Sequence, residues 1–295
     1  MRKHIFSVLT YFGYFLYAPS FDEIHAFFPI KISKKNLQLL LAREVQRETI
    51  VQLSDNTLSR APQGPFINCQ PTSHHFLYTL PQYSTIKKIK LKNKTQNKIK
   101  KRISTIQRYI QMLETLPFVR FIGITGASAV EGLQQNDDLD LCIVTQHNLL
   151  WTTRFFAIVC AKLLRIHRRK EICLNLFFDE SHLALPKKKN NSYIAHELLQ
   201  MRSVVDKDNV YERFLEENRW IYTYFPNTKK VYAQVRAINQ QLKDKIVFVV
   251  IDRIFKSIQL PIIRRNNTAF SITNTQLWLF KNDFEKKLKR AGLVI

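Results

Sequence analysis

Residues 119–145 read VRFIGITGASAVEGLQQNDDLDLCIVT, and this stretch decides the fold. Its two apolar runs, residues 119–126 and 139–145, have the composition of strands and enclose a loop of small and polar residues. Asp138 and Asp140 stand at the head of the second run, separated by one leucine. Side chains at positions i and i+2 of a strand point the same way. The stretch therefore predicts two strands of one sheet, with paired carboxylates on one face where the second strand begins.

The charge of the whole chain is strongly unbalanced. Its 295 residues include 46 Lys and Arg against 23 Asp and Glu, a formal net charge of +23. The 45% hydrophobic content is that of a folded protein, and the length is that of two or three structural units. A basic surplus of this size favours a polyanionic partner: nucleic acid, a nucleotide or an acidic membrane surface.

The cysteines and the N-terminus both bear on the compartment. The four cysteines form no C-x-x-C pair, which favours free thiols in a reducing compartment. Residues 1–20 combine a basic start with an apolar stretch, as an export signal does, but their tyrosines and the poor cleavage site favour a first buried helix. No other run reaches the roughly 20 apolar residues of a membrane span. We expect a cytoplasmic protein without a membrane span.

The N-terminal region, residues 1–84, has the pattern of a winged helix. Helices are expected over residues 5–16, after a Ser20 cap and after a Ser33 cap, followed by two short strands around Asp55 and Asn56. The proline-rich residues 61–84 are expected to be a loop. The order of three helices and a hairpin is that of a winged-helix module, and a helical cap without such a function is the alternative.

A basic amphipathic helix is expected to connect this region to the centre, over residues 85–116. Its segment 87–102 carries nine Lys or Arg, and Pro117 limits its end. Such a run is either a solvated helix face or a surface that contacts phosphate groups of a nucleic acid.

The centre and the C-terminal part differ in pattern. Strands over residues 119–126, 139–145 and 171–179, with an apolar helix over 148–166, predict an α/β or α+β fold whose core, residues 117–192, is a small mixed sheet. Residues 193–295 are expected to be a helical C-terminal region. Its helices are expected over the ranges 193–204, 208–224, 227–258 and 274–292.

The paired carboxylates suggest a cation and a phosphate ligand. Two neighbouring carboxylates repel each other unless a divalent cation lies between them, and Mg²⁺ takes one or two carboxylates together with phosphate oxygens. The preceding loop can offer backbone N–H groups from Gly126 onward and the Ser128 hydroxyl to a phosphate. Out of this context, a pair of aspartates at a strand start is a solvated surface feature. In this context it indicates nucleotidyl or phosphoryl transfer.

These residues also carry a resemblance to a known family. Gly126-x-Ser128 followed by Asp138-Leu139-Asp140-Leu141 resembles the signature of the polymerase-beta-like nucleotidyltransferase superfamily. An uncharacterised bacterial and archaeal group of that superfamily, often with a winged-helix-like N-terminal region, is similar over about residues 5–228. The further segments that carry this similarity are residues 149–155, 172–183, 193–201 and 211–227. The resemblance implies a nucleotidyltransferase core that binds a nucleoside triphosphate with Mg²⁺ or Mn²⁺ and transfers a nucleotidyl group to a hydroxyl of an acceptor.

The sequence differs from the family pattern at two positions. Ala127 separates Gly126 from Ser128, where the family has the two adjacent, and the expected third acidic residue is replaced by Asn175. On the strand over 171–179, Glu171, Cys173, Asn175 and Phe177 are expected to share one face. An asparagine can offer a carbonyl oxygen to a metal but cannot act as a general base.

The expected site therefore combines a catalytic set with a nucleotide-binding set. Asp138, Asp140 and Asn175 form the catalytic set, with the two aspartates as metal ligands. Gly126, Ser128 and Arg154 are expected to contact the nucleotide, and pairing with an acidic residue is the alternative for Arg154. The alternative function is a nucleic-acid-binding or regulatory protein with a catalytically decayed core. For His196 and Glu197, packing is the alternative to a role in substrate positioning.

Overall fold

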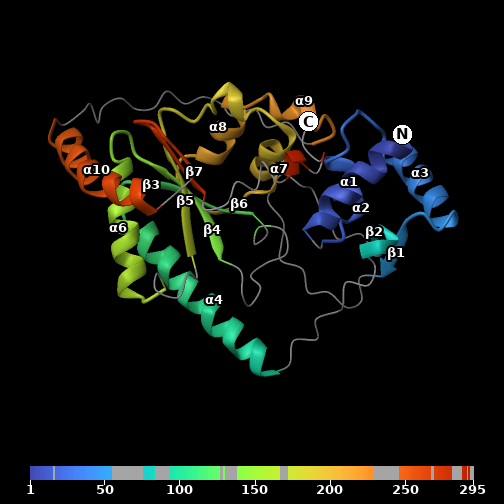
Figure 1. Cartoon of the computed structure of the whole chain (residues 1–295), viewed down its shortest axis with the longest axis horizontal. Helices are drawn as coiled ribbons and strands as arrows, with labels where there is room; N and C mark the ends of the chain where they lie inside the picture. Colours follow the sequence, from blue (N-terminus) through green and yellow to red (C-terminus); the bar gives the residue numbers. More distant parts are fainter. Residues whose placement is uncertain are drawn as a thin grey trace.

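The protein is built around one mixed sheet, seen nearly edge-on at the centre of the computed structural model in Figure 1. The structure describes residues 1–15, 17–54, 76–83, 93–126, 129, 138–166, 172–228, 246–266, 269–280, 288–290 and 292. The sheet has six strands in the order β6-β3-β4-β5-β8-β7. The strands are β3 (Val119–Thr125), β4 (Leu139–Thr145), β5 (Ile172–Asp179), β6 (Arg202–Asp206), β7 (Ala269–Ile272) and β8 (Gln276–Phe280).

Only one pair of neighbouring strands in this sheet is parallel. β4 and β5 run parallel, and helix α6 (Leu150–Leu163) lies between them in the chain. The pairs β3–β4, β3–β6, β5–β8 and β7–β8 are antiparallel. The expected mixed sheet in an α and β protein is therefore confirmed, with β3, β4 and β5 at its centre.

Helices cover both faces of the sheet. On one face lie α4 (Asn93–Glu114), α6 and α10 (Ile246–Asn266), with α6 packed against the other two. On the other face lie α7 (Ser192–Gln200), α8 (Val210–Glu217), α9 (Ile221–Tyr224) and the N-terminal helices. Leu139, Leu141 and Ile143 belong to the core under α6, whereas Cys142 and Val144 belong to the core on the opposite face. This alternation fixes the direction of every side chain of β4.

The N-terminal region begins with the expected helices. They are α1 (Arg2–Tyr14), α2 (Phe21–Ala26) and α3 (Lys34–Gln46). Helix α1 is buried through Ile5, Leu9 and Phe12, so the expected first buried helix is confirmed. Ser20 and Glu23 form a complete capping box at α2, and the Ser33 hydroxyl accepts from Asn36 N.

The strand after α3 pairs with a more distant segment of the chain. Strand β1 (Val51–Ser54) pairs with β2 (Phe76–Thr79), which lies in the segment expected to be a loop. The sequence Phe-Leu-Tyr-Thr has strand composition, and Leu77 and Tyr78 are buried against the N-terminal helices. Residues 55–75, where the second strand was expected, lie outside the described residues. A short 3-10 turn, η1 (Pro81–Tyr83), follows β2.

The C-terminal part is less helical than expected. Residues 202–206 were expected to end a helix, and residues 276–280 to lie in one; both are strands of the sheet. β6 pairs with β3 and β8 with β5, and the local sequence pattern does not reveal either pairing. The helix expected over 208–224 is two helices, α8 and α9, separated around Asn218, whose amide bonds to Leu183 O and Phe214 O. Residues 229–245, also expected to be helical, lie outside the described residues.

Helix length and hydropathy also bear on membrane insertion. Among the described residues, no helix is both long enough and apolar enough to cross a membrane. The basic helix α4 ends at Glu114, before Pro117, as expected, and the segment 84–92 that precedes it is not described.

Candidate functional site

The two aspartates lie side by side where β4 begins. Both are half-buried, and they point away from the core that holds Leu139 and Leu141. In the sheet register, Asp140 lies between Thr125 of β3 and Cys173 of β5. The carboxylates are thus held by a strand with hydrogen-bonded neighbours on both sides. The expected common face of the pair follows from the alternation seen along β4.

Asn175 contacts this pair from a bulge in β5. Leu141 pairs with Leu174 and Cys142 with Leu176, so Asn175 is an extra residue between two register pairs. Its amide Nδ2 donates to Asp140 Oδ1 at 2.7 Å. The position expected to carry a third carboxylate therefore contacts the carboxylate pair as an amide.

The same bulge corrects the expected face of Phe177. The period of two placed Phe177 with Asn175, but the extra residue reverses the alternation beyond it. Phe177 is fully buried in the core under α6, and Phe178 enters the core on the opposite face. Cys173 keeps its expected direction, because its thiol donates to Asp138 Oδ2 at 3.2 Å. Glu171 lies outside the described residues.

A glycine closes the site from the side of β3. Gly126 follows β3 with a φ of +66°, a conformation that favours glycine. A Cβ atom at this position would lie 2.8 Å from Asp140 Oδ2. The backbone therefore approaches the carboxylate more closely than any other residue type allows. Residues 127–128 and 130–137 are not described, so the predicted phosphate contact by Ser128 stays a prediction.

Glu197 is a member of this cluster that sequence reasoning did not assign to it. It lies on α7, and its Oε2 accepts a hydrogen bond from Gly126 N at 3.0 Å. Burial and the nearby Asp140 charge raise its pKa to about 7, although the Gly126 N–H opposes the shift. One feature of the sequence could have indicated this role: Glu197 lies on α7 next to the apolar positions Ala195 and Leu198, which are buried. An acidic residue next to a buried stripe indicates a specific partner.

His196, the neighbour of Glu197, has a packing role. Its ring stacks between the rings of Tyr11 and Phe27, with both centroid distances 4.0 Å. The ring is buried, and burial lowers the pKa of His196 well below its usual value. The neutral imidazole joins α1 and α2 to α7. The contacts of His196 are therefore those of a packed aromatic side chain.

Arg154 lies away from the carboxylate pair. It belongs to α6, which covers the face of the sheet that Leu139 and Leu141 enter. Its guanidinium donates to Gln259 Oε1 of α10 at 2.6 Å. Burial lowers the pKa of Arg154 to about 10. The structure therefore brings Asp138, Asp140, Asn175 and Gly126 together, and it places Arg154 between two helices on the other face.

The donor set limits which cation the cluster suits. Among the residues that the structure describes, no group of three or more His, Cys, Asp and Glu side chains is arranged to hold a metal ion. Two carboxylates and one amide remain at the start of β4. This set is too small for a structural zinc site, which takes four protein ligands. It is compatible with Mg²⁺, which keeps waters and takes one or two carboxylates plus phosphate oxygens from a substrate.

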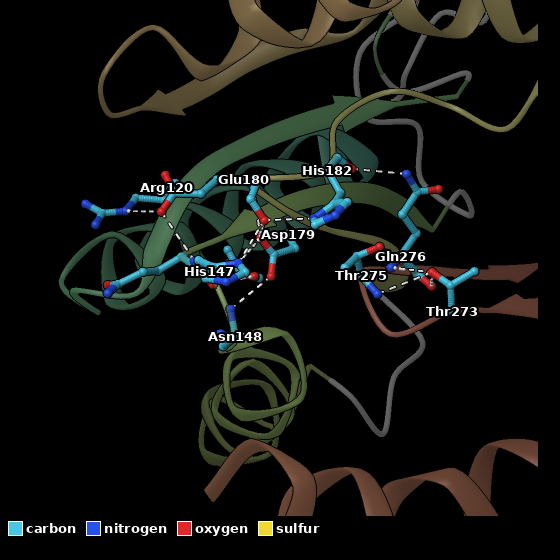
Figure 2. A network of polar contacts seen from close by, with 12 residues as sticks. Arg120, His147, Asn148, Asp179, Glu180, His182, Thr273, Thr275 and Gln276 are labelled. Carbon is cyan, nitrogen blue, oxygen red and sulfur yellow. Dashed lines mark hydrogen bonds and ion pairs between the residues drawn. The ribbon is translucent and has the colours of Figure 1, made fainter. Parts of the chain in front are cut away.

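A second polar network lies at the opposite end of β4 and β5 (Figure 2). The buried Asp179 accepts from Asn148 N and Ser181 N, both at 2.9 Å, and from the Ser181 hydroxyl at 2.6 Å. His147 Nδ1 lies 3.1 Å from Asp179 Oδ1 and 2.8 Å from Ser181 Oγ. The Glu180 carboxylate lies 3.6 Å from Arg120 Nε and accepts from His147 N.

This network has the composition of a nucleophilic triad but not its geometry. In a serine–histidine–aspartate triad, the serine and the aspartate contact different nitrogens of the imidazole. Here Ser181 and Asp179 contact the same Nδ1 atom of His147, and the serine hydroxyl donates to the aspartate directly. A proton cannot pass through the ring from Ser181 to Asp179 in this arrangement. The network instead ties the end of β5 to the loop that begins α6.

Comparison with known proteins adds no further assignment. Searches against protein-family models, curated proteins and solved structures find no match to this chain.

Proposed function

We propose that this protein is a metal-dependent nucleotidyltransferase that moves a nucleoside monophosphate from a nucleoside triphosphate to a hydroxyl of an acceptor. One observation carries the proposal: Asp138 and Asp140 share one face at the head of β4, with the Cα of Gly126 against Asp140. The place combines two hard oxygen donors with a glycine turn. Metal ligands beside backbone groups that can contact phosphate suit the transfer of a phosphorus-containing group.

Each described residue has a defined part in the proposal. Asp138 and Asp140 would hold Mg²⁺ or Mn²⁺, which would neutralise charge on the triphosphate and activate the acceptor hydroxyl. Asn175 orients Asp140 by donating to its Oδ1. Gly126 lets the backbone approach the Asp140 carboxylate closely, and Glu197 holds this turn through Gly126 N. Glu197 is thus a positioning residue in the proposed reaction.

Label transfer from nucleoside triphosphates tests the proposal. The full chain would be incubated with each α-labelled triphosphate, with Mg²⁺ or Mn²⁺, and with cellular RNA or protein as acceptor. We expect transfer with at least one acceptor, and its complete loss in Asp138→Asn/Asp140→Asn. Asp208→Asn is the matched control, because the Asp208 side chain is 75% exposed and lies at the other end of the sheet. Transfer that survives the double substitution would contradict the site.

One observation favours the alternative of a nucleic-acid-binding or regulatory protein with a decayed core. Asn175, at the expected third acidic position, cannot accept a proton from the attacking hydroxyl. In that case, the chain would neither transfer label nor bind nucleotide in a metal-dependent way. Binding to DNA or RNA that weakens steeply with salt would then be retained, because phosphate contacts by basic residues release counterions.

A further inference from the structure

Helix α10 carries a line of exposed aliphatic side chains along its whole length. Val250, Ile254, Ile258 and Ile262 follow one another every four residues, and each is between 48% and 57% exposed. Ile246 and Val247 extend the line at the start of the helix and are more exposed still. Scattered exposed aliphatics are ordinary on a protein surface, but a continuous line of them marks an interaction surface. We call these six residues the α10 stripe.

Polar contacts on the opposite side of α10 fix its rotation. Asp252 accepts from Thr152 N at 2.7 Å and from its hydroxyl at 2.8 Å. Gln259 donates to Trp151 O at 2.9 Å, and Ile263 is 2% exposed. These buried polar groups would lose their partners if the helix rolled, and a buried polar group without a partner is destabilising. The α10 stripe therefore cannot turn inward against α6.

The charges beside the stripe indicate its partner. The exposed charged residues of α10 are Arg253, Arg264 and Arg265, and its acidic residue, Asp252, is buried against Thr152. The chain as a whole has a net charge of +23. Two copies of this face would bring like charges together, and a nucleic acid offers phosphates but no large apolar surface for the aliphatic groups. An anionic lipid surface complements both features, since it offers acyl chains beneath charged head groups.

We propose that α10 lies flat on a membrane surface that contains anionic phospholipids. The α10 stripe enters the boundary between head groups and acyl chains, and Arg253, Arg264 and Arg265 contact lipid phosphates. The helix has 21 residues, a length of about 30 Å, and lies at the periphery of the protein beside α6 (Figure 1). No described helix is suited to crossing a bilayer, so the contact lies along the surface.

Vesicle co-sedimentation of the full chain tests the proposal. The vesicles are phosphatidylcholine alone, and phosphatidylcholine mixed with phosphatidylglycerol. We expect binding to the mixed vesicles and at least tenfold weaker binding to phosphatidylcholine alone. Ile254→Ser/Ile258→Ser should weaken binding to the mixed vesicles at least tenfold. Leu39→Ser is the matched control on α3, because Leu39, Ile254 and Ile258 are each 53% exposed.

Two further readouts separate this proposal from its rivals. Arg253→Gln and Arg264→Gln should each weaken binding to anionic vesicles about fivefold. If the isoleucine pair can be replaced without effect, the vesicles are bound by charge elsewhere and the proposal is overturned. The molecular mass in solution without lipid is expected to be that of a monomer. A dimer that the isoleucine substitutions dissociate would assign the stripe to a second copy and also overturn it.

Discussion

Acidic residues lie at both ends of strands β4 and β5, but the two groups differ in their burial and in their hydrogen-bond partners. At the end where β4 begins, Asp138 and Asp140 are half-buried and contact the side chains of Cys173 and Asn175. At the opposite end, Asp179 is 2% exposed and accepts from the backbone N–H groups of Asn148 and Ser181. Backbone donors of a folded loop cannot be removed without unfolding the loop.

This difference separates a structural carboxylate from a candidate ligand-binding one. Asp179 is enclosed by groups that fold around it, and its partners include the loop before α6. The aspartate pair is half-buried and lies beside a glycine whose backbone closely approaches Asp140. We therefore expect Asp179 to control stability, and Asp138 and Asp140 to control binding of ligands.

Removal of the Asp179 carboxylate should cost the most stability. Asp179→Ala leaves two part-buried backbone N–H groups and the Ser181 hydroxyl without this acceptor. We expect the free energy of unfolding to fall by about 3–5 kcal/mol, measured by urea denaturation. Asp208→Asn is the control and should change it by less than about 0.5 kcal/mol, because that side chain is 75% exposed and asparagine tolerates the φ of +67° at this position. An equally large loss in Asp140→Ala would remove the distinction between the two ends.

Glu197 should make stability depend on pH near neutrality. Its pKa is raised from 4.5 to about 7 in the folded protein, mainly by burial. The folded state therefore holds a proton that the unfolded state releases, so the stabilisation is complete below about pH 4.5 and is lost as the pH rises through about 7. The loss amounts to at most about 3 kcal/mol.

The measurement for Glu197 is a comparison of two proteins across that pH range. Urea denaturation of the wild type and of Glu197→Gln would be followed at several pH values. The difference between their free energies of unfolding should change with pH, because glutamine does not titrate. Other titrating groups contribute equally to both proteins and cancel. A difference that stays constant would show that Glu197 does not titrate in the folded protein.

A third carboxylate at position 175 should make the site depend on a divalent cation. Asn175→Asp replaces the amide that donates to Asp140 Oδ1 with a negative charge. We expect a loss of about 2 kcal/mol in unfolding free energy without divalent ions, and its recovery on addition of Mg²⁺. Asn175→Ala is the control, because it removes the hydrogen bond without adding charge and should not respond to Mg²⁺. The same lack of response in Asn175→Asp would argue against a cation at this place.

The sequence predicted the part of the fold that depends on local pattern. The alternation of Asp138, Leu139, Asp140 and Leu141 predicted the start of β4 and the direction of its side chains. This succeeded because the leucines of this strand face a buried core and the aspartates alternate with them. Helix capping by Ser20 and Ser33 was also predictable from the sequence, because a cap contacts a residue only three positions away.

Contacts between distant segments explain what the sequence did not predict. Strands β6 and β8 are stabilised by pairing with β3 and β5, so their residues alone do not distinguish strand from helix. The bulge at Asn175 depends on the register between β5 and β4, which the period of two cannot show. Glu197 joined the site for the same reason, since α7 lies 71 residues from Gly126 in the chain.

The close approach of Gly126 to Asp140 allows a specific test of ligand binding at the aspartate pair, and its expected effect is the smallest. Gly126→Ala places a methyl group 2.8 Å from Asp140 Oδ2, at a φ of +66° that costs a non-glycine residue about 1–2 kcal/mol. Gly292→Ala is a matched control, because Gly292 has a φ of +69° and a Cβ there meets nothing within 4 Å. Both variants bear the backbone cost, so any further change in Gly126→Ala reports on Asp140. We expect weaker metal-dependent binding of nucleoside triphosphate in Gly126→Ala alone, measured by calorimetry. Equal binding by the two variants would mean that the position of the Asp140 carboxylate does not affect binding of the ligand.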